Sequence, residues 1–241
     1  MQTDPPRRRT GLIVTVIVVP VVLVLAIAGV GTFLVVRAIS GALPAGWRSA
    51  GFVVETSDDA VRDEVGQLLV ACVGGEARYV VRSRGVQVGV PPAQQPRLGQ
   101  LVSRLPIDTS VSLRPVLDGT TGDQLRSLDG KTNYTLGPAG LTGERVTQAS
   151  LASGPSGGWL VNVTFDSAGS KQLASLTGQL RGKQLAIVAA GAVISAPLVQ
   201  DAITGGQLQV TGQFTQTEAR GIAAAFQLGR HPVAIKAGDP G

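Results

Sequence analysis

One long hydrophobic segment near the N-terminus constrains this chain most, because it divides the sequence into a membrane part and an exported part. Residues 11–36 contain no charged side chain. As a helix that rises about 1.5 Å per residue they would measure about 39 Å, which exceeds the hydrocarbon core of about 30 Å. The segment therefore predicts a transmembrane helix that crosses the bilayer with some tilt.

Basic residues on the two sides of this segment predict its orientation. Three arginines at residues 7–9 precede it, whereas Arg37 alone follows it. Because positive charge is kept on the cytoplasmic side, we expect residues 1–10 to be cytoplasmic and everything after Arg37 to be extracytoplasmic. A cleaved signal peptide is the alternative, but its apolar region runs only about 7–15 residues. We favour an uncleaved, single-pass signal anchor in the cell membrane, followed by a short stalk at residues 37–46.

The charges of the exported part argue against nucleic acid as a partner. The whole chain has 21 basic and 16 acidic residues. Without Asp4, Arg37 and the arginines at residues 7–9, a net charge of +2 remains with no basic cluster, whereas a nucleic-acid binder keeps a basic face. A hydrophobic content of 44% is enough to build a core. The 17 arginines against four lysines indicate a GC-rich, actinobacterial source.

No group of residues is arranged for catalysis, a metal or a cofactor. Ser156 lies in a G-x-S-x-G pattern, but this pattern precedes a strand, and His231 is the only histidine. Cys72 is the only cysteine, so no intramolecular disulfide can form, and we expect it to be a small buried residue. The sequence therefore predicts a protein that is not an enzyme and needs no metal and no cofactor.

The first part of the exported region, residues 47–118, is expected to be a small α+β unit. A strand at residues 52–55 leads into a helix that starts with a capping box of Thr56 and Asp59 and ends at Gly74. Further strands are expected at residues 79–82, 86–90 and 111–117, with a second helix before the last strand. The order β-α-β-β-α-β is typical of a split β-α-β, ferredoxin-like fold.

The first helix is expected to be amphipathic. Its apolar residues recur at steps of three and four positions and form one face: Val61, Val65, Leu68, Leu69 and Cys72. We expect its carboxylates on the solvated face, namely Asp58, Asp59, Asp63 and Glu64.

A polar, glycine-rich stretch at residues 119–132 marks the predicted boundary between two subdomains. Gly119, Gly122 and Gly130 are our candidate hinge residues within it. The second subdomain covers residues 133–236 and is followed by a short tail at residues 237–241.

The second subdomain is also expected to be α+β. A strand at residues 159–165 alternates polar and apolar side chains, and an entirely apolar strand at residues 185–188 is expected at the centre of a sheet. Gly205 and Gly206 are expected to close a helical turn. A capping box then predicts the start of the last helix, and its two residues are Thr215 and Glu218.

Several motifs of the second subdomain resemble the head of the first large extracytoplasmic domain of the SecD family. They are LAIV at residues 185–188, VISAP at 193–197, ITGG at 203–206, TG-x-F-T-x-x-EA at 211–219 and YTLGPAGLTG at 134–143. Shorter matches resemble the base of the same domain, namely VQVGVPP at residues 86–92 and LRPVLDG at 113–119.

The matching residues are structural in type, and the resemblance implies a fold without a catalytic group. We interpret seven of them as head-motif positions that shape turns and helix starts: Ser195, Pro197, Gly205, Gly206, Gly212, Thr215 and Glu218. Ser195 in particular is expected to cap or turn the chain before Pro197. The fold class is therefore expected to be α+β, with one transmembrane helix, a ferredoxin-like base and a SecD-like head.

The resemblance also implies a membrane system for protein export. The family uses this domain outside the membrane to handle preproteins that leave the secretion channel, while a multi-helix membrane domain couples the motion to proton flow. The family's D-L-R-G-G motif is missing here, and residues 189–192 read AAGA where L-D-G-K is usual. We therefore expect a truncated single-span relative without that membrane domain.

Two functions remain open on this basis. The first is a membrane-anchored module that binds exported polypeptides, secretion-channel proteins or envelope proteins in support of export. The second is a structural or interaction domain of the cell envelope that has the fold and no export role, since a fold does not carry a function with it.

Overall fold

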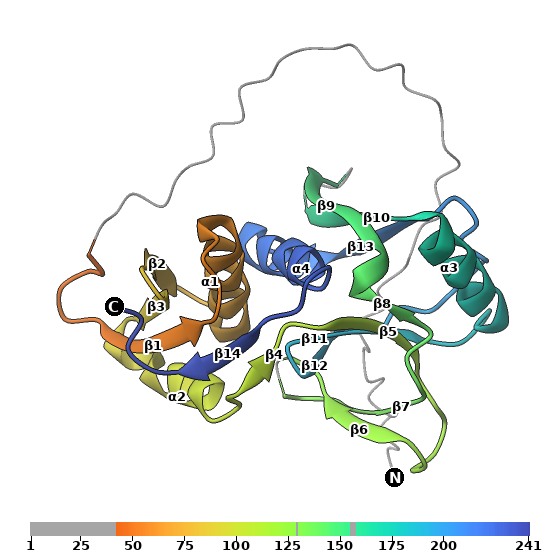
Figure 1. Cartoon of the computed structure of the whole chain (residues 1–241). Coiled ribbons are helices and arrows are strands. Elements are labelled where there is room, and N and C mark those ends of the chain that lie inside the picture. Colours follow the sequence, from red (N-terminus) through yellow and green to blue (C-terminus); the bar gives the residue numbers. More distant parts are fainter. Residues whose placement is uncertain (1–41, 129, 155–157) are drawn as a thin grey trace, which may run out of the picture.

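A computed structural model describes residues 42–241, apart from residue 129 and residues 155–157 (Figure 1). This part of the chain is a mixed α+β fold with four sheets and four α-helices, in agreement with the predicted class. The predicted transmembrane segment at residues 11–36 lies outside the described residues. Within the described part, no helix combines the length and the hydropathy that a membrane span requires.

The base sheet has five strands in the order β2-β3-β1-β14-β4, and all neighbouring strands are antiparallel. These strands are β1 (Arg48–Val54), β2 (Arg78–Arg82), β3 (Gly85–Val90), β4 (Ile107–Asp108) and β14 (Ala234–Ala237). Because β1 and β2 both run antiparallel to β3, they are parallel to each other with β3 between them, as a split β-α-β unit requires. Helices α1 (Asp59–Val73) and α2 (Gln95–Val102) pack on these strands and contact each other, and a 3-10 helix, η1 (Pro92–Gln94), precedes α2.

Helix α1 starts at a different capping residue from the one predicted. The carboxylate of Asp58 accepts a hydrogen bond from Ala60 N at 2.8 Å, so Asp58 is the N-cap. The predicted capping box of Thr56 and Asp59 is wrong, because Thr56 Oγ1 accepts from the N–H of Asp58 instead. Aspartate is at least as good an N-cap as threonine, and the pattern alone does not rank two candidates this close. The helix ends at Gly74, as predicted.

One of the two strands that pair with β1, β14, comes from the end of the chain. The segment predicted as the last strand of the base is β5 (Val111–Pro115), and it pairs with β11 (Leu185–Ala189) in another sheet. Its assignment to the base is therefore wrong. The position is filled by β14, whose Ile235 is fully buried. Alternating apolar residues predict a strand but do not specify which sheet that strand joins.

The remaining strands form two sheets and a hairpin. The sheet with the order β12-β11-β5-β8 has at its two edges β12 (Ala192–Ser195) and β8 (Leu141–Thr142). The sheet with the order β13-β10-β9 consists of β13 (Gln207–Phe214), β10 (Trp159–Phe165) and β9 (Val146–Ser153). The hairpin consists of β6 (Asp123–Arg126) and β7 (Asn133–Leu136), and a 3-10 helix, η2 (Gly143–Arg145), follows β8.

Helix α4 (Gln216–Leu228) joins the base to the other sheets. It contacts α1 on one side and β9 and β10 on the other (Figure 1), whereas α3 (Ser167–Gln179) lies next to β8 and β10. Helices α1 and α4 approach so closely at Gly221 that a Cβ there would collide with the Cβ of Ala71. One hydrophobic cluster therefore runs from Phe52 in the base sheet through Phe226 of α4 to Leu208 of β13.

The chain passes between the base and the other sheets at two points that lie side by side. It leaves the base after β4 and returns between α4 and β14. Thr109 joins the two crossings, because its N–H donates to Val233 O at 3.2 Å and its hydroxyl accepts from Val233 N at 2.8 Å. Residues 109–233 are thus an insertion between the strands β4 and β14 of the base.

Candidate functional site

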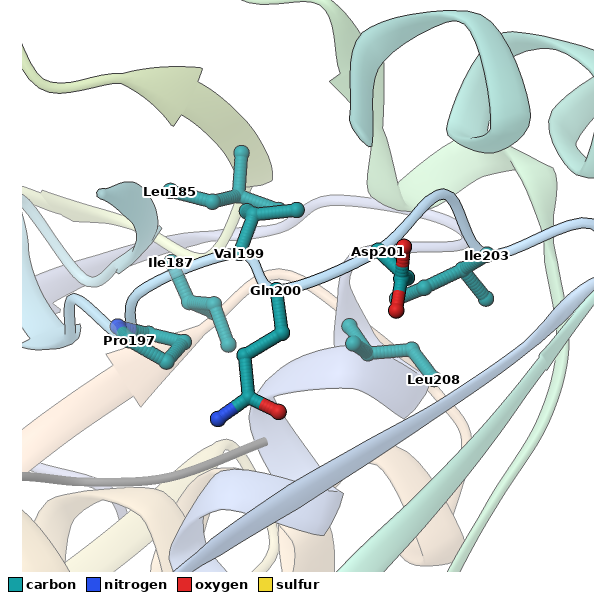
Figure 2. A pocket seen from close by; sticks show the side chains of 8 residues that line it. All are labelled: Leu185, Ile187, Pro197, Val199, Gln200, Asp201, Ile203 and Leu208. Atoms are coloured by element: carbon teal, nitrogen blue, oxygen red, sulfur yellow. The ribbon is translucent and has the colours of Figure 1, made fainter. Parts of the chain in front are cut away.

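The stretch from β11 to the start of α4 holds the head-motif residues. After β12 the chain returns to β11, and Pro197 O accepts a hydrogen bond from Leu185 N at 2.9 Å. A small cavity of about 10 Å³ lies here (Figure 2), lined by Leu185, Ile187, Pro197, Val199, Gln200, Asp201, Ile203 and Leu208. Such a volume holds about one water molecule. This cavity is therefore a packing gap of the core and has no room for a small-molecule ligand.

Ser195 does not play the turn-capping role that we expect from its position before Pro197. It is the last residue of β12 and pairs with Ile187 of β11. Its Oγ is buried and has no hydrogen-bond partner among the described residues. The expected capping role is wrong, because the residue continues the strand and its hydroxyl bonds to no turn.

Gly205 and Gly206 shape a bend rather than the predicted helical turn. The residues between β12 and β13 contain no helix. Gly206 has a φ of +68°, and a Cβ on it would collide with Ser170 Oγ in the first turn of α3. Its carbonyl accepts a hydrogen bond from Phe165 N at 3.0 Å, so this glycine brings the chain close enough to pair with β10.

Thr215 and Glu218 form the predicted capping box of α4. Thr215 Oγ1 accepts from Glu218 N at 3.3 Å, and Glu218 Oε2 accepts from Thr215 N at 2.8 Å. Gly212 lies just before them in β13, where a Cβ would come within 2.7 Å of the Phe214 ring. Together these residues fix the sharp passage from β13 into α4, and none of them forms a chemical site.

The candidate hinge glycines lie in the loops around the β6–β7 hairpin. Gly119 and Gly122 follow β5 with φ values of +134° and +151°, and Gly130 is in the turn of the hairpin with a φ of +72°. A Cβ on Gly122 would lie 2.6 Å from Leu136 O, so this glycine permits a close approach of two backbone segments. None of the three lies where the chain passes between the base and the other sheets, and a hinge at these residues stays a prediction.

The structure describes two of the three residues set aside as catalytic candidates. Ser156 lies outside the described residues, and His231 is in the connection between α4 and β14. Burial raises the pKa of the Cys72 thiol to about 11, so this thiol is a poor nucleophile. No group of three or more histidine, cysteine or carboxylate residues suitable for a metal occurs in the described part of the chain.

Four carboxylates were expected on the solvated face of α1, and for two of them, Asp63 and Glu64, that expectation is wrong because both are half-buried. Asp63 accepts hydrogen bonds from the Tyr79 hydroxyl at 2.8 Å and from Gln67 Nε2 at 2.7 Å. Burial raises the pKa of Glu64 to about 7, with Asp58 and Asp63 adding to the effect and Arg230 opposing it.

The position of Glu64 in the sequence could have predicted that it is partly buried. Glu64 lies three residues after Val61 and four before Leu68, at the edge of the apolar stripe that packs inward.

A wider hollow lies at the end of the base from which the stalk emerges. It is open, has a volume of about 890 Å³, and lies between residues 47–50 and the segment formed by η1 and α2. At its margin the Arg78 guanidinium lies 5.6 Å from the centroid of the Trp47 ring, within the range of a cation–π contact. Its lining is mixed, with Arg48, Ser49 and Gln95 as polar members beside apolar residues.

Comparison with known proteins identifies this arrangement of sheets. Residues 121–233 match the family model of the SecDF P1 head subdomain. The protein translocase subunit SecD of Streptomyces coelicolor is 36% identical over 110 residues, which cover 43% of this chain and 19% of that protein. SecD of Dictyoglomus turgidum is 31% identical over 186 residues, which cover 76% of this chain and 42% of that protein. The chain thus spans less than half the length of these curated relatives.

A solved structure supports the same fold. The crystal structure of SecDF from Thermus thermophilus, described as a translocon-associated membrane protein, matches 80% of this chain and 30% of its own chain. The TM-score is 0.50 and the sequence identity is 26%. Because the matched region includes the base as well as the head, it agrees with the resemblance of both parts of the sequence. The part of the chain that the structure describes is therefore a P1 domain of the SecD family.

Proposed function

We propose that this chain is a membrane-anchored, extracytoplasmic and non-enzymatic module that binds exported polypeptides or envelope proteins in support of protein export. The similarity of its head to the P1 head of protein translocase subunits carries this proposal. As the family resemblance implies, the base in this proposal stays near the membrane and the head moves relative to it, with the glycine-rich loops around the β6–β7 hairpin as the proposed hinge.

The start of the described chain supports a position close to the membrane. Leu43 packs over Gly89 of the base, so closely that a Cβ on this glycine would lie 2.7 Å from the leucine side chain. Only residues 37–41 separate this part from the proposed anchor at residues 11–36. The seven residue steps from Val36 to Leu43 span at most about 25 Å, so a base held in this way stays near the lipid surface.

Crosslinking in cells tests the proposal. With a photo-crosslinking residue at exposed positions of the head, we expect adducts with arriving preproteins or with the secretion channel, and slower secretion of some substrate after gene deletion. A crosslinker at Arg84, at the far end of the base, is the matched control. Adducts with envelope proteins only, together with unchanged secretion rates, would favour the alternative of a structural or interaction domain of the envelope.

The absence of enzymatic activity is tested separately. We expect the purified chain to hydrolyse no member of an ester and peptide panel. Hydrolysis that is lost on Ser156→Ala would overturn this part of the proposal.

A further inference from the structure

The three-stranded sheet of the head has two long edges without any charge. Strands β9, β10 and β13 contain no charged residue and no proline. Three other edges are blunted in the usual ways: β2 begins and ends with Arg78 and Arg82, and β4 and β8 have two residues each. Soluble proteins normally protect a long edge with charge, proline or brevity. The edges of this sheet therefore keep an uncommon capacity to pair with another strand.

Of the two edges, β13 is the open one. The edge of β9 is partly closed, because Gln227 of α4 donates from Nε2 to Ala149 O at 2.9 Å, and α4 lies along this strand. Strand β13 pairs only with β10 within the described residues. An approaching strand would thus meet free main-chain groups on the β13 side.

The register shows which main-chain groups of β13 are available. Phe165 N donates to Gly206 O at the start of the pairing, and the pairs then follow each other without interruption up to Val210. In an antiparallel ladder, residues alternate between bonding to the partner and pointing away from it. Val210 therefore bonds to β10, whereas the N–H and C=O groups of Gln207 and Gln209 point outward.

The side chains around this edge are polar but carry no charge. Gln207 is exposed, and Gln209 Nε2 donates to Asn162 Oδ1 of β10 at 3.0 Å. On the other face, Leu208 and Val210 are buried in the core. An added strand would continue a polar surface that repels neither acidic nor basic segments.

We propose that the outer edge of β13 binds an extended segment of an exported polypeptide by strand addition, through hydrogen bonds to the main chain of Gln207 and Gln209. This inference rests on the proposed function and names its site. Exported polypeptides differ in sequence, and the feature they share is the backbone. Strand addition binds that backbone through main-chain hydrogen bonds, while side-chain pockets supply specificity. The cavity within this head is too small to hold a side chain. The result is weak binding that tolerates many sequences.

Peptide binding tests the proposal without changing the protein. The full chain in detergent is titrated with a twelve-residue peptide from the mature part of a secreted protein, with its scrambled form, and with a form N-methylated at every residue. We expect the first two to bind equally and the third to bind about tenfold more weakly, since only the methylated form lacks main-chain donors on both of its edges. Equal binding of the N-methylated peptide overturns the proposal.

Two variants at position 209 distinguish peptide binding through the main chain from binding through the side chain. Gln209→Pro removes an outward N–H that no internal bond uses, as edge strands tolerate, and we expect about tenfold weaker binding. Gln209→Thr keeps the backbone and a good strand former, and we expect unchanged binding. The proposal fails if the threonine variant loses as much affinity as the proline variant.

Hydrogen exchange locates the bound peptide even where a variant fails to fold. With saturating peptide we expect slower exchange in fragments within residues 207–214 and no change within β2. Protection elsewhere overturns the proposal. A dimer in sedimentation that Gln209→Pro dissociates also overturns it, in favour of pairing between two copies of this chain.

The proposed function can survive this failure, because preprotein crosslinks in cells would remain while the β13 measurements turn out negative. It fails independently if those crosslinks are absent.

Discussion

Gly206 is the residue at which backbone geometry and packing both require glycine. Its φ of +68° is strained for any residue with a Cβ, and the added Cβ would also meet Ser170 of α3. We expect Gly206→Ala to lower the free energy of unfolding by about 1–3 kcal/mol, measured by urea titration. Gly205→Ala is the matched control, because nothing lies within 4 Å of a Cβ there. Equal effects at both positions would contradict this account.

Glu64 makes stability depend on pH in the direction opposite to that of a salt-bridged carboxylate. Its folded pKa of about 7 lies above the ordinary value of 4.5, chiefly because of burial. Between these values the folded state binds more protons than the unfolded state, so the free energy of unfolding falls as pH rises through this window. Glu64 is only half-buried, and solvent screening limits the effect to about 1 kcal/mol.

Glu64→Gln should abolish that dependence. We expect the variant to gain stability over the parent at about pH 8 and to match it near pH 4, as measured by urea unfolding at a series of pH values. The exposed carboxylate of Glu144 lies outside α1, and Glu144→Gln should leave the pH profile as it was. A profile that Glu64→Gln does not alter would show that another group titrates.

Helices α1 and α4 pack closely because residue 221 is a glycine and has no Cβ methyl group. A Cβ on Gly221 would collide with that of Ala71, so the two helices pack at the distance that a glycine permits. We expect Gly221→Ala to lower the free energy of unfolding by about 1–3 kcal/mol through overpacking. The double variant Gly221→Ala with Ala71→Gly returns the methyl group to the same gap and should recover much of the loss. Additive losses in this cycle would exclude the proposed contact.

The elements themselves were largely predictable, because each follows from a local pattern. The capping box of Thr215 and Glu218 and the glycine end of α1 are confirmed, since a few neighbouring residues determine them. The pairing partners were not predictable in the same way. Strand β5 was predicted in the base and lies in another sheet, whereas β14 was not predicted at all. The sheet that each of them joins is decided by contacts with residues far away in the sequence.

The candidate site shows the same limit. Motif matches located the head residues, but Ser195 turned out to continue a strand and Gly206 to form a bend. The open edge of β13 depends on which strands lie beside it, and that is a property of the assembled sheet. The sequence shows that the strand is uncharged, and only the topology shows that its outer edge pairs with no other strand among the described residues.

At the scale of the whole molecule, the inserted head and the base share one core. The base is complete only when β14 returns from the far end of the chain, and Ile235 of this strand is fully buried. Thr109 and Val233 join the two crossings, and α4 packs on both parts. Unfolding of either part would therefore expose apolar surface of the other.

This coupling predicts a single unfolding transition for base and head. The two tryptophans of the chain report on one part each, Trp47 at the start of the base and Trp159 in β10. We expect the variants Trp47→Phe and Trp159→Phe to give the same urea midpoint when followed by fluorescence, because a shared core unfolds cooperatively. Circular dichroism of each variant is the control, since it follows all helices at once. Two separate midpoints would mean that the head unfolds as an independent unit, and that the contact between α1 and α4 adds little to the stability of the base.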